Sequence, residues 1–302
     1  MSLISPRVSV IIPTYNRAHL IGRAIQSVMD QTYQDFEVIV VDDGSTDNTE
    51  EVVLSFGSEK MRYIRHDKNR GAGAARNTGI RAARGEYIAF QDSDDKWYPN
   101  RLDEISGIIE DREDIDFIFS YGKIIKNGEV IGDVGRAPWA NDLSREELVV
   151  RLFSSNFIAL QGVVVKKERI LEAGGFDERL PSAEDYELWL RLLPICSVYF
   201  VDKPVYDLYF SQECITNNIT RVMKSQVRIL IKNRNILRRH VRSRAQYYAV
   251  MQRYISFIFS RAAYDTANRK GRKRLARLLY LLSRVLYPDF IALTKRITGC
   301  IR

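Results

Sequence analysis

The sequence predicts an α/β fold, with a mostly parallel sheet flanked by helices and a basic helical region after it. Over the first hundred residues, short β-branched runs alternate with segments whose apolar residues recur at helical spacing. Such alternation is typical of strands joined by crossover helices, which build a parallel sheet with helices on both faces. From Ile219 onward helical segments dominate, and basic residues greatly outnumber acidic ones.

Apolar periodicity and chain breakers define the elements of the first hundred residues. The first strand, Val8–Ile12, is a β-branched run that stops at Pro13, and the following helix has apolar residues at positions 20, 21, 24, 25 and 28. Several possible N-caps at residues 45–49, followed by two glutamates, predict the start of a second helix. The other predicted elements are strands over residues 36–41, 62–65 and 87–90 and an Ala-rich helix over residues 72–83.

The pattern is looser beyond residue 100. Gly128 predicts a hairpin between strands at residues 117–121 and 129–131. Further strands are expected at residues 162–165 and 198–201, the last ending before Pro204, and helices at residues 169–173 and 184–193. We expect residues 1–215 to form the α/β domain and residues 216–302 the helical region.

The composition fits one large globular domain, or one domain with an appendage. The chain has 302 residues, of which 45% are hydrophobic and 28% are charged. Its three cysteines match no zinc or redox spacing, which favours free thiols in a reducing compartment. We find no signal peptide and no run of about 18 uncharged apolar residues, so we expect a cytoplasmic protein without a membrane-spanning helix.

The net charge of +8 hides a strong asymmetry. Residues 218–302 contain 21 Lys and Arg but only two acidic residues, whereas residues 1–217 contain 25 basic and 36 acidic residues. Within the basic region, Leu275–Leu293 can form an amphipathic helix with arginines opposite an apolar stripe. This region suits docking to an anionic membrane surface or packing on the acidic body or another subunit; nucleic-acid binding is the least favoured alternative.

Three carboxylates, Asp92, Asp94 and Asp95, follow the predicted strand at residues 87–90. Carboxylates this close raise one another's pKa unless a cation lies between them, and Mg²⁺ or Mn²⁺ prefers such oxygen ligands. A solvated acidic turn is the simpler alternative. A calcium loop of the helix–loop–helix type is disfavoured, because the fifth position from Asp92, which should supply an oxygen, is Lys96.

Polar clusters also follow the first two predicted strands, and ligands of parallel sheets bind at the carboxyl ends of the strands. Pro13-Thr14-Tyr15-Asn16-Arg17 offers an aromatic ring that can stack on a nucleobase, and Asp43 offers an acceptor for a base N–H. Plain turns are the alternative for both segments. Residues 69–77 form a glycine-containing loop at a helix start, which favours anions but matches neither the Walker nor the dinucleotide-binding pattern.

Five segments, taken in chain order, carry a family resemblance. They are Val8–Arg17, Val40–Thr49, Gly71–Gly79 with Ala75-Arg76-Asn77, Gly85–Asp95, and Gly174–Glu178 with Ala183–Trp189. Together they closely resemble family 2 of the inverting, nucleotide-sugar-dependent glycosyltransferases over residues 7–210. The resemblance implies a Rossmann-like glycosyltransferase A fold for the catalytic domain, residues 1–215.

The resemblance also implies a donor site. Tyr15 and Asp43 would hold the base, most often uracil, and Asp94 would face the ribose. The remaining residues that it assigns to donor binding are Pro13, Thr14, Arg17, Gly71, Arg76 and Asn77.

A metal and a base follow from the same resemblance. Asp95, with Asp94 beside it, would bind the Mn²⁺ or Mg²⁺ that bridges the two phosphates, and Asp185, in the pair Glu184-Asp185, would be the catalytic base. The chemistry agrees, because the departing diphosphate gains charge that a metal ion stabilises and the acceptor hydroxyl must lose a proton to a carboxylate. Without the resemblance, acids at a helix start would be interpreted as favouring the helix dipole.

We therefore expect an inverting glycosyltransferase that uses a nucleotide-diphosphate sugar, UDP-sugar first, and transfers one or a few sugars. Its acceptor would be a glycan or lipid-linked glycan at the inner face of the membrane, in cell-surface polysaccharide synthesis. One alternative is a sugar-1-phosphate nucleotidyltransferase, although its glycine-rich loop after the first strand is replaced here by Pro13-Thr14-Tyr15. The other is a non-catalytic scaffold that binds a polyanion.

Overall fold

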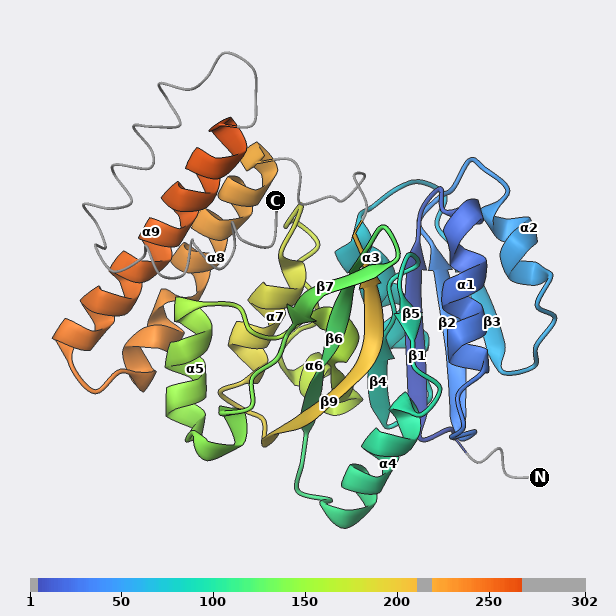
Figure 1. The fold of residues 1–302 in the computed structure, drawn as a ribbon, viewed down its shortest axis with the longest axis horizontal. Coiled ribbons are helices and arrows are strands. Elements are labelled where there is room, and N and C mark those ends of the chain that lie inside the picture. The colour runs from blue at the N-terminus through green and yellow to red at the C-terminus, as the bar shows by residue number, and fades with distance from the viewer. Residues whose placement is uncertain (1–4, 211–218, 268–302) are drawn as a thin grey trace. The chain divides into compact units, whose positions relative to one another are not determined.

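The computed structural model describes residues 5–210 and 219–267 and has the predicted α/β architecture (Figure 1). The sheet of the described chain has nine strands in the order β3-β2-β1-β4-β8-β6-β9-β5, with β7 paired to β6. The strands are β1 (Val8–Thr14), β2 (Phe36–Asp42), β3 (Met61–Arg65), β4 (Tyr87–Phe90), β5 (Lys96–Trp97), β6 (Phe117–Lys126), β7 (Glu129–Val134), β8 (Val164–Lys166) and β9 (Val198–Tyr209). The helices are α1 (Ala18–Met29), α2 (Thr49–Leu54), α3 (Ala72–Ala82), α4 (Arg101–Asp111), α5 (Arg145–Ser154), α6 (Lys167–Glu172), α7 (Glu184–Leu192), α8 (Ile219–His240) and α9 (Arg244–Ala267), with short 3-10 turns η1 (Ala140–Asp142) and η2 (Leu160–Gly162).

The parallel half of the sheet is built around β1. This strand pairs in parallel with β2 on one side and β4 on the other, and β2 pairs in parallel with β3. Thr14 lies opposite Asp42, and Ile11 lies opposite Phe90. Because of this register, the loops that follow β1, β2 and β4 leave the sheet at the same edge, as the alternation of strands and helices predicted.

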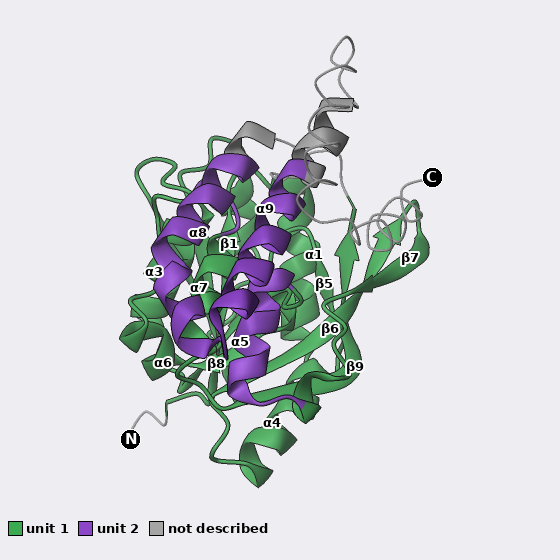
Figure 2. Ribbon diagram, turned by 90° about the vertical axis from the view of Figure 1, so that its left-hand side faces the viewer, with its two compact units in different colours: residues 1–142, 157–180, 184–210 green, residues 143–156, 181–183, 211–302 purple. Residues whose placement is uncertain are grey.

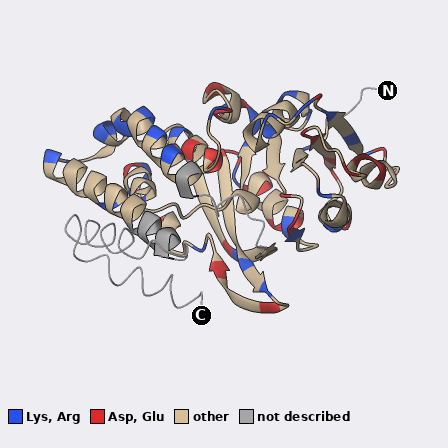
Figure 3. Cartoon of the chain, turned by 90° about the horizontal axis from the view of Figure 1, so that it is seen from above, with Lys and Arg blue, Asp and Glu red and all other residues tan. Residues whose placement is uncertain are grey.

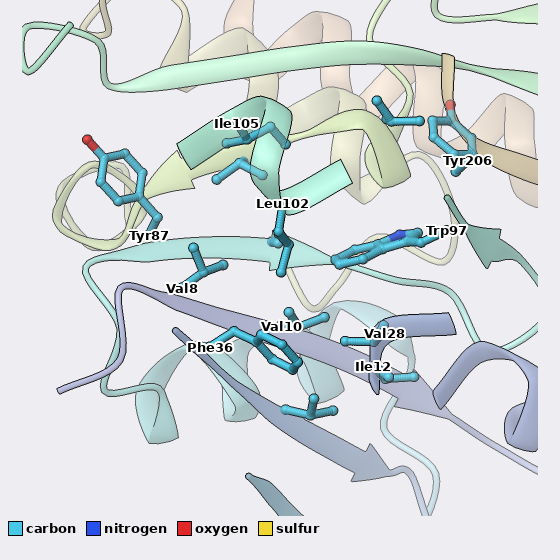
Figure 4. Close-up of a cluster of buried hydrophobic side chains, with 14 of the residues drawn as sticks. Val8, Val10, Ile12, Val28, Phe36, Tyr87, Trp97, Leu102, Ile105 and Tyr206 are labelled. Atoms are coloured by element: carbon cyan, nitrogen blue, oxygen red, sulfur yellow. The ribbon is translucent and has the colours of Figure 1, made fainter. Parts of the chain in front are cut away.

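Successive residues of β1 face two different helical layers, as strand geometry requires. Ile11 faces α3, where a Cβ on Gly79 would lie 2.6 Å from Ile11 Cγ2, so this helix packs directly on the strand. The opposite face of β1 belongs to a buried apolar cluster with α1 and α4 (Figure 4), whose members include Val8, Val10, Ile12, Ile21, Ile25, Val28, Leu102 and Ile105.

The second half of the sheet is mixed. β8 is antiparallel to both β4 and β6, whereas β9 is parallel to β6. The expectation that the last strand ends before Pro204 is wrong, because β9 continues to Tyr209. Its pairing with β6 shifts register where Tyr121 lies opposite Pro204, and a proline, which lacks an N–H donor, is tolerated at such an irregularity. The strand expected at residues 162–165 starts later, because η2 occupies its first position.

The chain divides into two compact units (Figure 2). Unit 1 comprises residues 1–142, 157–180 and 184–210 and contains the whole sheet, and unit 2 comprises residues 143–156, 181–183 and 211–302. Within unit 2, α5 packs with α8 and α9. The boundary between residues 215 and 216 stays a prediction, and α5 joins the helical unit although it precedes that boundary in the sequence.

Among the described residues of unit 2, basic side chains are most frequent on α8 (Figure 3). This helix contains no acidic residue, and its exposed basic side chains include Lys224, Arg234, Arg238 and Arg239. Ser225, Ile229, Asn233 and Leu237, which recur every four residues, form its buried face. The amphipathic segment expected at residues 275–293 lies outside the described residues.

No helix within the described ranges is long and apolar enough to cross a membrane. Cys196 is buried, and the other two cysteines, at positions 214 and 300, lie outside the described residues.

Candidate active site

The acidic turn after β4 combines one deeply buried carboxylate with two that are partly exposed. Asp95 is 2% exposed, and its Oδ1 accepts a hydrogen bond from the Tyr209 backbone N–H at 2.9 Å while its Oδ2 accepts one from Gln161 Nε2 at 2.5 Å. Burial, reinforced by the charges of Asp92 and Asp94, raises the pKa of Asp95 well above its usual value. Burial and the charge of Asp92 also raise the pKa of Asp94. A nearby cation would favour the ionised form of both carboxyl groups.

Arg76 joins this turn to the start of α7. Its Nη2 donates to Asp92 Oδ1 at 2.8 Å and its Nη1 donates to Glu184 Oε1 at 2.6 Å, in a side chain that is almost fully buried. Burial disfavours the guanidinium charge, but the surrounding carboxylates outweigh it and hold the pKa of Arg76 above its usual value. Both terminal nitrogens of this predicted donor-binding residue therefore bond to carboxylates of the protein.

Asp185 follows Glu184 in the first turn of α7 and is partly exposed. Burial raises the pKa of Asp185 to about 6; the charge of Glu184 acts in the same direction, and that of Arg76 opposes it. A carboxylate with this pKa is still mostly ionised at neutral pH and is a stronger base than an ordinary aspartate. The structure thus brings the predicted base and the predicted acidic turn into one connected cluster within unit 1.

Gln161 is a site residue that the sequence analysis missed. It lies in η2, and its Nε2 donates to Asp92 Oδ2 at 2.7 Å as well as to Asp95 Oδ2. The sequence does contain a signal, because Gln161 is the one polar side chain in the apolar run from Ile158 to Val165. A lone amide in such a run is buried with the strand beside it and must find hydrogen-bond partners there.

Two arginines from the region of α1 approach the acidic turn. Arg23, which was also missed, donates to the backbone carbonyl of Asp94, and its guanidinium carbon lies 3.8 Å from the centre of the Tyr209 ring. The predicted donor-site residue Arg17 lies close enough for its charge to counteract the rise in the pKa of Asp94. This edge of the turn therefore carries the positive charge that suits a phosphate.

The loop after β1 presents Tyr15 to solvent. Pro13 and Thr14 are buried in the strand, whereas Tyr15 is 43% exposed. Asn16 has a positive φ of 51° and ties this loop to the one after β2, since its backbone N–H donates to Ser45 Oγ at 2.8 Å. The loops after β1 and β2 are thus hydrogen-bonded to each other, and the exposed Tyr15 ring is available for stacking.

Asp43 is 3% exposed, and its carboxylate organises the loop that leads into α3. The backbone N–H of Gly71 donates to Oδ2 at 2.7 Å, the N–H of Arg70 donates to both oxygens, and His66 Nδ1 lies 2.7 Å from Oδ1. These four contacts, two on each oxygen, occupy the roughly four acceptor positions of the carboxylate. Gly71 starts α3 with φ of 95°, a conformation that favours glycine.

Asn77 holds the segment that precedes α7. Its Oδ1 accepts from the Phe176 N–H at 2.8 Å, and its Nδ2 donates to the Phe176 carbonyl and to Glu178 Oε1, both at 2.9 Å. A Cβ on Gly175 would lie 2.7 Å from Asn77 Oδ1, so only glycine fits there. This predicted donor-site residue uses its amide within the protein, where it anchors the loop before the predicted base.

A mostly parallel sheet flanked by helices is what the sequence resemblance implied for the fold. The model of Glycosyl transferase family 2 matches residues 9–167, and the chain belongs to this family. The chain is 32% identical over 235 residues to the Escherichia coli UDP-Glc:α-D-GlcNAc-diphosphoundecaprenol β-1,3-glucosyltransferase WfgD. The alignment covers 74% of this chain and 85% of WfgD. It is 37% identical over 200 residues to an uncharacterised glycosyltransferase of Rickettsia typhi, but that match covers 65% of this chain and only 61% of the relative.

Solved structures support the fold. TarS residues 1–349 of S. aureus, in complex with UDP-GlcNAc, match with a TM-score of 0.65 at 20% identity, covering 94% of this chain and 91% of that one. The mannosyltransferase PcManGT of Pyrobaculum calidifontis, in complex with GDP-Man and Mn²⁺, matches with a TM-score of 0.57 at 19% identity, covering 95% and 89%. These matches confirm the predicted glycosyltransferase A type of fold.

Proposed function

We propose that the chain is an inverting glycosyltransferase that moves a sugar from a nucleotide-diphosphate sugar to a hydroxyl group of a glycan or lipid-linked acceptor. The observation that carries the proposal is the hydrogen-bonded cluster that runs from Asp95 through Asp92 and Arg76 to Glu184 and ends beside Asp185. It joins a set of carboxylates suited to a metal-bound diphosphate with a carboxylate suited to proton transfer.

Asp185 is the proposed general base. With a pKa of about 6, it is ionised at neutral pH and can accept the proton of the acceptor hydroxyl. The oxygen of that hydroxyl forms a bond to the anomeric carbon, while the bond from this carbon to the phosphate oxygen breaks and its electron pair leaves with the diphosphate. Attack on the face opposite the diphosphate inverts the configuration of the anomeric carbon.

The acidic turn fits a divalent cation that takes most of its ligands from the donor. Among the described residues, no group of three or more His, Cys, Asp or Glu side chains is arranged to hold a metal by itself. Mg²⁺ and Mn²⁺ sites commonly use one or two carboxylates plus substrate phosphates, and Asp95 with Asp94 supplies that number. A bound cation would relieve the repulsion that raises the pKa of Asp95 and would stabilise the charge on the departing diphosphate. The Mn²⁺ in the PcManGT complex supports this assignment.

The loops after β1 and β2 suit the nucleoside. The exposed ring of Tyr15 can stack on the base, and Asp43 can accept a base N–H if one of its oxygens is shared with the backbone donors that already bond to it. Arg17 provides charge next to Asp94, where the diphosphate would lie. UDP-sugars are favoured because TarS binds UDP-GlcNAc and the name of WfgD specifies UDP-Glc.

The acceptor is proposed to be presented at a membrane surface, as for a peripheral enzyme of cell-surface polysaccharide synthesis. WfgD acts, by its name, on a sugar linked to diphosphoundecaprenol, which is a lipid. The exposed basic side chains of α8 suit an anionic headgroup layer. Sedimentation of the protein with vesicles containing about 30% phosphatidylglycerol tests this point; failure to sediment with them at low salt would contradict it.

The Asp185→Asn variant tests the catalytic proposal. It should bind UDP or GDP with Mn²⁺ as the native protein does, yet lose about 10²- to 10⁴-fold in transfer, because the amide cannot accept the proton. Transfer is measured from radiolabelled UDP-glucose, UDP-GlcNAc and GDP-mannose to a GlcNAc-diphosphate lipid. Asp202→Asn, an exposed carboxylate paired with Arg136, is the matched control and should keep full activity. Transfer at the native rate by Asp185→Asn would refute the base, and pyrophosphate release from UTP and a sugar 1-phosphate would instead indicate a nucleotidyltransferase.

A further inference from the structure

We propose that Gln161 is a positioning residue whose side-chain amide holds the carboxylates of Asp92 and Asp95 at a fixed separation and so links the metal side of the site to the base side. The inference deepens the proposed function and rests on it for its catalytic consequence. Its geometric basis stands on the hydrogen bonds alone.

Gln161 is the middle member of a continuous hydrogen-bonded chain. Each carboxylate turns one oxygen to Gln161 and the other to a different element, so that Asp92 also bonds to α3 and Asp95 also bonds to β9. The links in order are the Tyr209 N–H to Asp95 at 2.9 Å, Gln161 Nε2 to Asp95 at 2.5 Å, Gln161 Nε2 to Asp92 at 2.7 Å, Arg76 to Asp92 at 2.8 Å and Arg76 to Glu184 at 2.6 Å. Without Gln161 this series of hydrogen bonds is interrupted, and the proposed metal ligand Asp95 is no longer linked to the side that holds the proposed base.

A neutral amide suits this position better than a charged group. The NH₂ group of glutamine carries two hydrogens, so one nitrogen can donate to both carboxylates. A lysine or arginine at the same place would add a positive charge and compete with the cation for the carboxylates. With Gln161 the two carboxylates lie close together and receive no added positive charge from the bridging group, so both stay available to a divalent cation.

The backbone around Gln161 is held firmly against the sheet. A Cβ on Gly162 would lie 2.2 Å from the Ser120 carbonyl oxygen, so η2 is in close contact with β6. Ser120 Oγ donates to the Gly162 carbonyl at 3.1 Å, and Arg101 Nη2 donates to the Val163 carbonyl at 3.3 Å. Gln161 itself is 6% exposed. A side chain mounted in this way can set the position of its partners, whereas one on an exposed loop cannot.

Thermal unfolding of a double-mutant cycle tests the bridge without any ligand. Gln161→Leu should lower the melting temperature, because two neighbouring carboxylates lose their shared donor. In the Asp92→Asn background the same change should lower the melting temperature less, because the repulsion between the carboxylates of Asp92 and Asp95 is gone. The two decreases in melting temperature should differ by at least about 2 °C. Equal decreases in melting temperature in the two backgrounds would overturn the inference.

Nucleotide binding then tests the link to the metal side. With Mn²⁺, Gln161→Leu should weaken the binding of UDP, or of GDP if the native protein prefers it, by about 10- to 100-fold, and Gln161→Glu by more. Ser120→Ala is the matched control, since it removes a bond to the same turn without touching the carboxylates; it should lower the melting temperature but keep the affinity. Native affinity in Gln161→Leu would contradict the inference. If the native protein binds neither nucleotide, the proposed function fails, and the unfolding cycle alone decides whether Gln161 is the bridge.

Discussion

The pH dependence of catalysis should follow the ionisation of Asp185, and Glu184→Gln should shift it to lower pH. Asp185 must be ionised to accept a proton, so kcat/KM of the native protein should fall as the pH drops through about 6. Glu184 acts on this group through its negative charge, which disfavours a second charge on Asp185. The variant removes that charge and also frees Arg76 from one of its two carboxylates. Both effects favour the ionised form of Asp185.

The size of the shift can be worked from the raised pKa. A value of about 6, compared with 3.8 for an ordinary aspartate, disfavours the ionised form by about 3 kcal/mol. Burial is the larger cause and remains in the variant, whereas loss of a neighbouring like charge changes a pKa by about one unit or more. A pKa near 5 would leave about half of Asp185 ionised at pH 5, compared with about a tenth in the native protein. The ratio of kcat/KM at pH 5 to that at pH 8 should therefore rise about fivefold.

The assay measures the release of nucleoside diphosphate between pH 4.5 and 8.5, with a donor and an acceptor that can both saturate the enzyme. The variants are compared by the pH at which kcat/KM falls on the acid side of the profile (the acid limb). The plateau value of kcat/KM is not compared, because it also depends on the position of Arg76. Glu172→Gln, an exposed carboxylate paired with Arg169, is the control and should leave the limb in place. An acid limb that stays in place or moves to higher pH in Glu184→Gln would refute the electrostatic assignment.

Three further predictions concern the metal side, the sheet and its stability. Asp95→Ala should weaken Mn²⁺-dependent UDP binding about 100-fold by calorimetry, while metal-free binding stays the same. Gly79→Ala should destabilise the protein by about 1 to 3 kcal/mol in urea unfolding, because its Cβ would collide with β1, whereas Gly107→Ala, which has open space in α4, should be neutral or stabilising. Burial opposes ionisation of Glu37, but hydrogen bonds from Arg84 and Ser9 outweigh burial and lower the pKa of Glu37. Ionised Glu37 therefore stabilises the folded protein above about pH 4.5, and this stabilisation is lost in acid. The melting temperatures of Glu37→Gln and the native protein should converge at acidic pH.

The parallel half of the sheet was accessible from the sequence because its signals are local. Each of its strands is a short β-branched or aromatic run, as Val8–Ile12 is. The expectation that the first strand stops at Pro13 is wrong, because β1 continues through Pro13 to Thr14, where both residues pair with β2. Strand–helix alternation then implies parallel pairing, and parallel pairing implies that the strand ends share one edge. The helix α5 also had a local signal, the capping box formed by Ser144 and Glu147, which the sequence analysis did not use.

The pairing of the second half and the connections within the site were not accessible, because they depend on distant residues. Pro204 indicated a strand end, yet β9 passes through it at a shift in register with β6, which only the partner strand defines. Arg76 and Glu184 are 108 positions apart, and Gln161 and Asp92 are 69 positions apart. Periodicity and turn chemistry report on neighbours in sequence, so the acidic turn and the base could be predicted separately, but the chain of hydrogen bonds between them could not.

Calorimetric titration of the purified protein with UDP, GDP, dTDP and CMP, each with and without Mn²⁺, tests whether the acidic turn binds a metal-bound diphosphate. One nucleoside diphosphate, with UDP favoured, should bind tightly only when Mn²⁺ is present. Binding of none of the four, or binding that is indifferent to the metal, would contradict the assignment of the acidic turn to a metal-bound diphosphate.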